Sequence, residues 1–174
     1  MVKSRPSGSY GTFAPTRKTM ITKHLISGFA FGISMSFISW IVGMIINAIL
    51  MKTEYYKEIS SLNFIKNKTL NKNIGINYFK WIVKNTFFKY FNQKIKLENN
   101  KADLGEIRNE MTFSEISHLI GFLFVTICAI YQGLNQSIVY GMTMIIPNIL
   151  MNLFPSLLQQ ENKRRIDTIL KRRE

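Results

Sequence analysis

The stretch LIGFLFVTICAIYQGLNQSIVYGMTMIIPNILMNLFPSLLQQ, from Leu119 to Gln160, decides the fold, because its 42 residues contain no charged side chain. A hydrocarbon core about 30 Å thick is crossed by ~20 apolar helical residues. The stretch therefore predicts two transmembrane helices joined by a tight turn. A second uncharged run of 27 residues, from Leu25 to Met51, predicts one more span. These runs exclude a water-soluble enzyme.

We therefore predict an all-α integral membrane protein with about three transmembrane helices and an interfacial amphipathic helix. The predicted spans cover residues 25–50, 115–132 and 138–158, with an interfacial segment over residues 52–112. Together they form a single helical membrane domain, residues 20–174. Residues 1–19 are rich in Ser, Gly, Thr and Pro and lack apolar periodicity, so we expect a disordered or non-native extension there.

Local signals set the predicted ends and bends of these spans. Thr112 or Ser114 is a plausible N-cap for the second span. Gly133 and Asn135 form the predicted turn to the third span. Pro155, inside the third span, frees a backbone carbonyl and kinks the axis, which a membrane helix tolerates where it lines a cavity or packs on protein.

The formal net charge of +13 is distributed around the uncharged runs. The segment 52–112 carries twelve basic and six acidic side chains, and residues 161–174 carry six basic ones. Basic residues beside apolar spans are typical of cytoplasmic membrane faces and bind anionic headgroups. We therefore expect membrane lipids as partners and no nucleic acid. The single cysteine, Cys128, excludes an internal disulfide and a cysteine-based zinc site.

Three spans place the middle segment and the C-terminal tail on the same side of the membrane. Their eighteen Lys and Arg residues predict that this side is cytoplasmic in a multi-pass protein of the cell membrane. The basic N-terminus would then lie outside, against the positive-inside rule. Either Met20 is the natural start of the chain, or the first apolar run is re-entrant.

The middle segment is unusually aromatic for a polar loop. Apolar residues recur there at steps of three and four, which is the period of an amphipathic helix: Ile76, Phe79, Val83, Phe87 and Tyr90. With lysines beside this face, we expect a helix that lies in the headgroup plane. The alternative is a helix that docks a partner membrane protein through residues 76–91.

Glu115 and His118 open the second span and are the candidate catalytic pair. Residues three apart share a helix face, so the carboxylate and the imidazole can touch. A carboxylate beside a histidine raises its basicity and fixes its tautomer, as a general base requires. The alternative is an interfacial pair that faces lipid headgroups.

Polar side chains form a stripe along the third span and the tail. Asn148, Asn152, Gln159 and Asn162, followed by Arg165, share roughly one helical face. They predict binding of a sugar or of the pyrophosphate of an acyl donor. Hydrogen bonding between helices is an equally common use of Asn and Gln in membranes.

Several kinds of chemistry have no support in the sequence. A di-iron site needs two Glu-x-x-His elements, and there is one, so we expect no metal. No G-x-S-x-G elbow, P-loop or dinucleotide fingerprint is present.

The layout of these motifs resembles the glycosyl-4,4'-diaponeurosporenoate acyltransferase family, small bacterial membrane proteins of carotenoid synthesis. The resemblance rests on Glu115-Ile116-Ser117-His118, on Asn152-Leu153-Phe154-Pro155, on Gln159, Asn162 and Arg165, and on the aromatic segment Gly75-Ile76-Asn77-Tyr78-Phe79-Lys80. The family usually has Arg-Tyr where this chain has Gln160-Glu161.

The resemblance implies transfer of a fatty acyl group from an acyl-thioester to a hydroxyl of a glycosylated carotenoid or related glycolipid. The thioester, on coenzyme A or acyl carrier protein, is a co-substrate, and no cofactor is expected. In this hypothesis His118 is the base, Glu115 orients it, and Asn152, Gln159, Asn162 and Arg165 bind donor or sugar. The alternative is a non-enzymatic membrane subunit that assembles with a partner.

Overall fold

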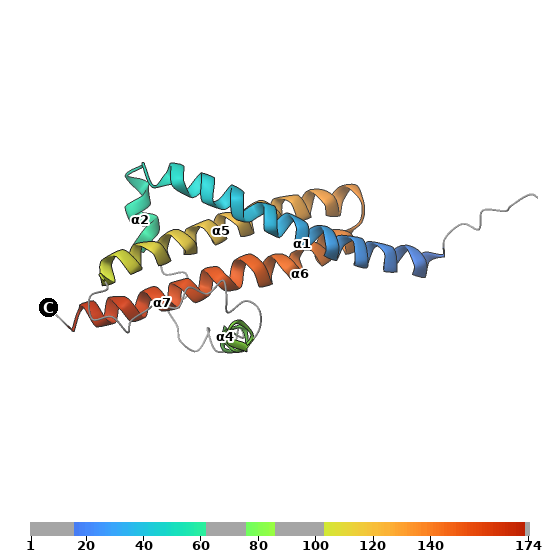
Figure 1. Ribbon diagram of the computed structural model, residues 1–174. Coiled ribbons are helices and arrows are strands. Elements are labelled where there is room, and N and C mark those ends of the chain that lie inside the picture. Colours follow the sequence, from blue (N-terminus) through green and yellow to red (C-terminus); the bar gives the residue numbers. More distant parts are fainter. Residues whose placement is uncertain (1–15, 62–75, 86–102, 173–174) are drawn as a thin grey trace, which may run out of the picture.

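The computed structural model describes residues 16–61, 76–85 and 103–172. Its elements in chain order are α1 (Arg17–Leu50), α2 (Tyr55–Ser61), α4 (Ile76–Asn85), α5 (Leu104–Asn135), α6 (Ile138–Asn148), the π-helical turn η2 (Ile149–Leu153) and α7 (Phe154–Leu170). The segments α6, η2 and α7 follow one another without a break and form a single long rod. Figure 1 shows α1, α5 and this rod side by side as a three-helix bundle.

All three long helices are long and apolar enough to cross a membrane. Their burial pattern is the reverse of that in a water-soluble protein. Ser36, Ser39 and Asn47 of α1 are fully buried, whereas Ile26 and Ile41 are 67% and 58% exposed. A continuous apolar surface of this kind is unfavourable in water, so the outer faces must contact lipid. The predicted all-α membrane fold is thereby confirmed.

Small and polar residues on one face of α1 hold the bundle together. The buried residues of this helix are Gly28, Gly32, Ser36, Ser39, Gly43 and Asn47. A methyl group at Gly43 would overlap the carbonyl oxygen of Ser117, and one at Gly28 would lie 2.6 Å from that of Tyr140. Backbones can approach this closely only where side chains are absent.

Two helix starts differ from the predictions. The cap of α5 is Asp103, whose Oδ1 accepts a hydrogen bond from the backbone N–H of Gly105 at 2.8 Å. The predicted cap Thr112 lies inside the helix and donates to the carbonyl of Arg108. The helix extends to Leu104 because its first turns have a packing partner: Leu104 and Met111 pack on Ile166 of α7.

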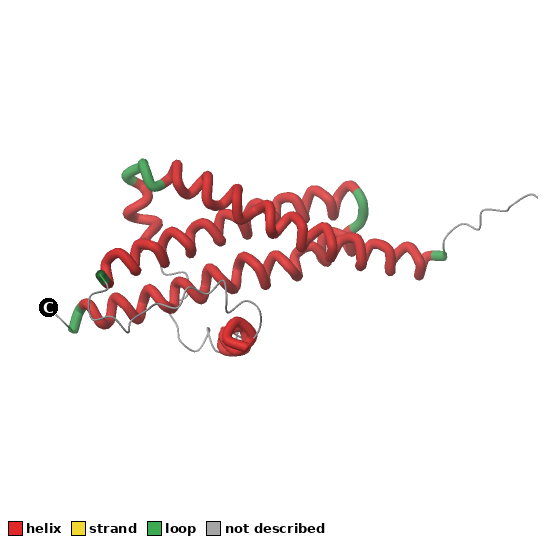
Figure 2. Tube along the Cα trace, viewed as in Figure 1, coloured by secondary structure: helices red, strands yellow, loops and turns green. Residues whose placement is uncertain are grey.

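At the N-terminus, α1 begins at Arg17, capped by Thr16, inside the segment expected to be disordered; residues 1–15 lie outside the described ranges. The turn between α5 and α6 falls at Gln136 and Ser137, slightly later than predicted (Figure 2). Ser137 caps α6 by accepting from the N–H of Tyr140 at 3.1 Å.

The predicted amphipathic helix is present as α4, and in Figure 1 it is seen end-on, so it lies across the direction of the bundle. Its apolar face is covered by the chain itself, because Phe79 and Val83 pack against Leu158 of α7. Phe87 and Tyr90 lie outside the described residues. Phe79 and Val83, which the alternative of docking on a partner protein would require on the surface, are therefore buried against α7.

We expect Gly43→Ala to lower the stability of the protein in detergent by about 1–3 kcal/mol, because the new methyl group forces α1 away from α5. Gly133→Ala is the matched control, since a methyl group there would meet its nearest neighbour at an ordinary 3.7 Å. Thermal unfolding followed by circular dichroism measures both. Equal stability of the two variants would contradict the close packing at Gly43.

Candidate functional site

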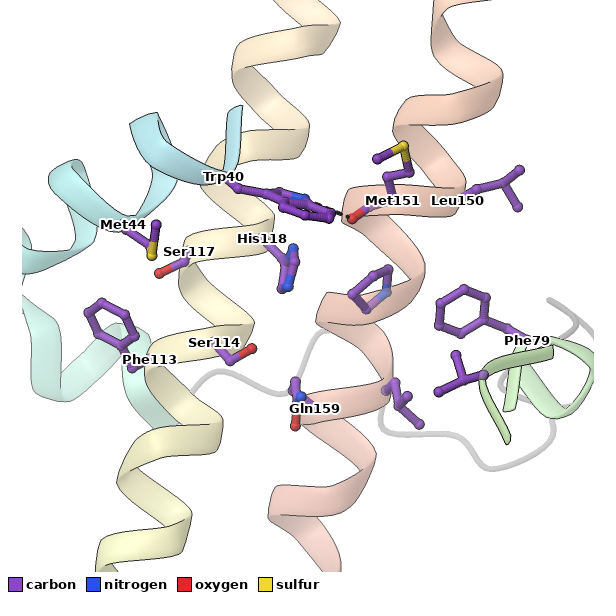
Figure 3. Close-up of a pocket in the computed structure, with 13 residues that line it drawn as sticks. Trp40, Met44, Phe79, Phe113, Ser114, Ser117, His118, Leu150, Met151 and Gln159 are labelled. Carbon is purple, nitrogen blue, oxygen red and sulfur yellow. Dashed lines mark hydrogen bonds between the residues drawn. The ribbon is translucent and has the colours of Figure 1, made fainter. Parts of the chain in front are cut away.

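A pocket of about 400 Å³ lies between α1, α4, α5 and the η2–α7 segment (Figure 3). It is within the size range of small-molecule sites. Each of these elements contributes lining residues: Trp40 and Met44 from α1; Phe79 and Val83 from α4; Phe113, Ser114, Ser117 and His118 from α5; Leu150, Met151, Pro155, Leu158 and Gln159 from η2 and α7.

The pocket lies where the third long helix of the bundle, the rod formed by α6, η2 and α7 (below, the third rod), departs from a regular α-helix. Pro155 has no backbone N–H, so the carbonyl four residues earlier, that of Met151, loses its helical donor. The indole N–H of Trp40 donates to this carbonyl at 3.3 Å. The backbone N–H of Phe154 meanwhile bonds five residues back, to Ile149, which widens the turn. The freed carbonyl predicted for Pro155 is thus present, and α1 supplies the missing donor.

His118 projects into this pocket from α5 and packs edge-on against the Trp40 ring, with centroids 6.2 Å apart and planes at 88°. Its imidazole interacts with the side chain of Asn152. Neither His118 Nδ1 nor Asn152 Oδ1 has a partner in hydrogen-bond geometry, although both atoms are buried. A buried polar atom without a partner is costly, and a small shift of either side chain would pair these two atoms with each other.

Three further polar residues face the same pocket. Ser114 and Ser117 lie on α5 beside His118, and Gln159 lies opposite them on α7 (Figure 3). The hydroxyl of Ser117 accepts a hydrogen bond from the Asn47 amide at 2.9 Å. Of the predicted residues, the structure therefore brings His118 and Gln159 together in one pocket, with Asn152 behind the imidazole.

Glu115 has other partners than the one predicted. Its Oε2 lies 2.7 Å from the ammonium of Lys163, and its Oε1 accepts from the Gln160 amide at 3.1 Å. Lys163 also donates to the carbonyl of Ser60 at 2.9 Å. The ion pair is almost completely buried, with 2% and 3% side-chain exposure. The carboxylate that was expected to orient His118 is instead part of a link between α5, α7 and α2.

Helix α2 approaches this buried pair through the carbonyl of Ser60 and the side chain of Tyr56. Burial, the largest effect, raises the pKa of the Tyr56 hydroxyl, the nearby Glu115 carboxylate raises it further, and a hydrogen bond with Asn47 partly offsets both. Tyr56 therefore remains neutral over the physiological range.

The rest of the polar stripe is divided between two uses. Asn152 donates to Ser39 at 3.0 Å and to Asn148 Oδ1 at 2.9 Å, and Asn148 donates to the carbonyl of Phe122 at 3.0 Å. These bonds join the three long helices. Asn148 and Asn152 therefore act as interhelical hydrogen-bond donors, the alternative that the sequence left open.

Asn162 and Arg165 do not line the pocket. Asn162 is half-buried on α7. Arg165 is 67% exposed and pairs with Glu161 at 3.1 Å. Both follow Gln159 along α7 toward the C-terminus, beyond the end of the pocket, so their predicted substrate contacts remain a prediction.

Sequence reasoning missed Trp40, Ser114 and Ser117 as pocket residues, and Lys163 as the partner of Glu115. The proline was the one signal for Trp40, because a freed carbonyl calls for a donor. Among the described residues, no group of three or more His, Cys, Asp or Glu side chains could hold a metal ion.

The sequence model of the glycosyl-4,4'-diaponeurosporenoate acyltransferases matches residues 52–172, well over half of the chain. The chain belongs to this family. No match was found among curated proteins or among solved structures. Membership makes the protein an acyltransferase of carotenoid biosynthesis. The matched region holds every pocket residue except Trp40 and Met44, which the first span of this acyltransferase supplies.

We expect Lys163→Met to destabilise the acyltransferase by about 3–5 kcal/mol, because it leaves the Glu115 carboxylate buried without its partner. The double variant Glu115→Gln with Lys163→Met should recover most of this loss. Arg165→Met, which removes an exposed charge, should change stability by about 1 kcal/mol or less. Unfolding in detergent measures all three, and a double variant no more stable than Lys163→Met would contradict the pairing.

Proposed function

We propose that the protein transfers a fatty acyl group from an acyl-thioester to a sugar hydroxyl of a glycosylated carotenoid. Family membership supports acyl transfer in carotenoid biosynthesis. The thioester donor, on coenzyme A or acyl carrier protein, and the sugar hydroxyl acceptor are the parts that this proposal adds. No cofactor is needed, because the thioester itself is the activated substrate.

One observation carries the mechanism. Among the described residues that line the pocket, His118 is the one histidine, and no acid, lysine, arginine, tyrosine or cysteine accompanies it. A hydroxyl nucleophile needs a base, and histidine is the side chain whose pKa is best placed for this at neutral pH. His118 is therefore the candidate general base.

In the proposed step, His118 takes the proton of the acceptor hydroxyl while its oxygen attacks the thioester carbonyl carbon. A carbon–oxygen bond forms, the carbon–sulfur bond breaks, and the proton passes from His118 to the departing thiolate. The products are an ester and a free thiol, so atoms and charges balance without an acyl-enzyme. A small movement that pairs Asn152 Oδ1 with His118 Nδ1–H would leave Nε2 free as the base.

Donors for the developing oxyanion are available in the same pocket. The hydroxyl of Ser114 and the amide of Gln159 lie on the side of His118, and the hydroxyl of Ser117 lines the pocket toward Met44. Preorganised donors aimed at such a charge are commonly the largest single contribution to acyl transfer. Gln159 therefore keeps its predicted role in substrate binding, and the two serines join it.

The exposed part of α7 suits the polar carrier of the donor. Asn162 and Arg165 follow Gln159, and a guanidinium binds phosphate oxygens well. This arrangement agrees with a cytoplasmic position of the middle segment and the tail, because acyl-thioesters are made in the cytoplasm. In this scheme Glu115 supports the bundle through Lys163 and takes no part in proton transfer.

We expect His118→Ala to lower formation of the acylated pigment by about 10²-fold or more, because general-base assistance is lost. His24→Ala is the matched control: it removes the other histidine of the chain, which contacts Tyr140 in α6 rather than the pocket. Mass spectrometry of pigment extracts from cells that make a glycosylated carotenoid measures both.

The same extracts distinguish the enzyme from a non-enzymatic subunit. If wild-type protein leaves every lipid and pigment unchanged, the acyltransferase proposal fails. If His118→Ala retains full activity in correctly inserted protein, the assignment of the base fails.

A further inference from the structure

The two side walls of the pocket differ in chemistry. On the α5 side, Ser114, Ser117 and His118 offer polar groups. On the α4 side, Phe79 and Val83 offer hydrocarbon (Figure 3). A ligand that contacts both walls needs a polar reactive group on the α5 side and an apolar chain that extends toward the α4 side.

The apolar wall is held firmly in place. The rings of Phe79 and Phe154 meet edge-on with centroids 5.2 Å apart, and Phe79 and Val83 also pack on Leu158. The ammonium of Lys80 lies 2.5 Å from the carboxylate of Glu161 on α7. A wall fixed by packing and an ion pair can discriminate between ligands by size, whereas a loosely held wall would move to accommodate larger ligands.

The rim of the pocket opens toward the lipid. Met44 of α1 and Leu150 of η2 line the pocket and are 47% and 43% exposed, within segments able to span a membrane. A hydrocarbon chain can therefore enter from the bilayer without crossing a polar surface.

We propose that the α4 wall binds the fatty acyl chain of the donor and that Phe79 and Val83 set the acyl length transferred; this inference rests on the proposed acyl transfer. The pocket residues of the third rod run from Leu150 to Gln159, ~13 Å at 1.5 Å per residue. A rigid carotenoid polyene is longer than this and cannot fold to fit. A saturated acyl chain can bend at each methylene and lie against Phe79 while its carbonyl faces His118.

The test is a competition assay. Membranes that contain the full-length protein and a glycosylated carotenoid receive an equimolar series of saturated acyl-CoA molecules of graded length, and mass spectrometry gives the acyl profile of the product. Val83→Ala shortens a side chain of the α4 wall and so enlarges the pocket, while the contact of Phe79 with Phe154 remains. It should raise the relative rate for a chain two methylenes longer by about tenfold, because each buried methylene contributes several-fold. Val83→Leu should shift the profile toward shorter chains.

Phe79→Ala removes a larger side chain from the α4 wall, so the pocket grows further and the acyl profile should move in the same direction as with Val83→Ala. Tyr78→Ala is the matched control on the same helix, since Tyr78 is 77% exposed and does not line the pocket; its profile should equal that of wild type.

Two results would overturn the inference. One is an unchanged acyl profile in both Val83 variants while product still forms. The other is an unchanged acyl profile with altered preference between carotenoid acceptors, which would place the acceptor on this wall. Absence of acylated product from the wild-type protein would instead reject the proposed function, so the two failures are distinguishable.

Discussion

Close contact between helix backbones is the constraint on which the structure depends. Lipid surrounds the bundle, so burying apolar side chains gives little preference for helix against helix. Association must come from packing and from buried hydrogen bonds. Gly43 allows α1 to reach the carbonyl of Ser117, and the next residue of α5 is His118. The position of the candidate base is thus set by a contact in which a single methyl group would not fit.

The same constraint explains why polar residues in this bundle do different work. Asn47, Asn148 and Asn152 donate to neighbouring helices, and their hydrogen bonds hold α1, α5 and the third rod in register. The imidazole of His118 differs from these groups, because it lines the pocket and none of the three amides does. Its Nδ1 is buried without a partner in hydrogen-bond geometry, which is costly in a low-dielectric interior. Asn47 Oδ1 and Asn152 Oδ1 are unpaired as well, so it is the position at the pocket that distinguishes the candidate base from the structural amides.

The sequence predicted what depends on local pattern and failed where distant residues decide. Two long uncharged runs sufficed for three spans, and the spacing of Phe79 and Val83 sufficed for α4. The start of α5 at Leu104 could not be predicted from hydropathy, since its first turns are charged and contact distant residues of α7, Ile166 by packing and Asp167 by pairing with Arg108. Glu115 was paired with His118 because they are three residues apart, yet its partner is Lys163, 48 residues further along. Small residues recur on α1 at every third or fourth position, a signal for its packed face that was present in the sequence and was missed.

The helix α4 connects the membrane fold with the chemistry proposed for it. Its sequence encodes an amphipathic helix, and the usual place for such a helix is the headgroup plane with its apolar face in lipid. Here Phe79 and Val83 contact Leu158 instead, so α7 takes the place of lipid and the helix becomes the wall of a pocket. The exposed side chains of Tyr78 and Trp81 remain free to contact headgroups. One helix can thus hold the boundary between water and lipid while it encloses the point where a hydrocarbon chain from one phase would meet a sugar from the other.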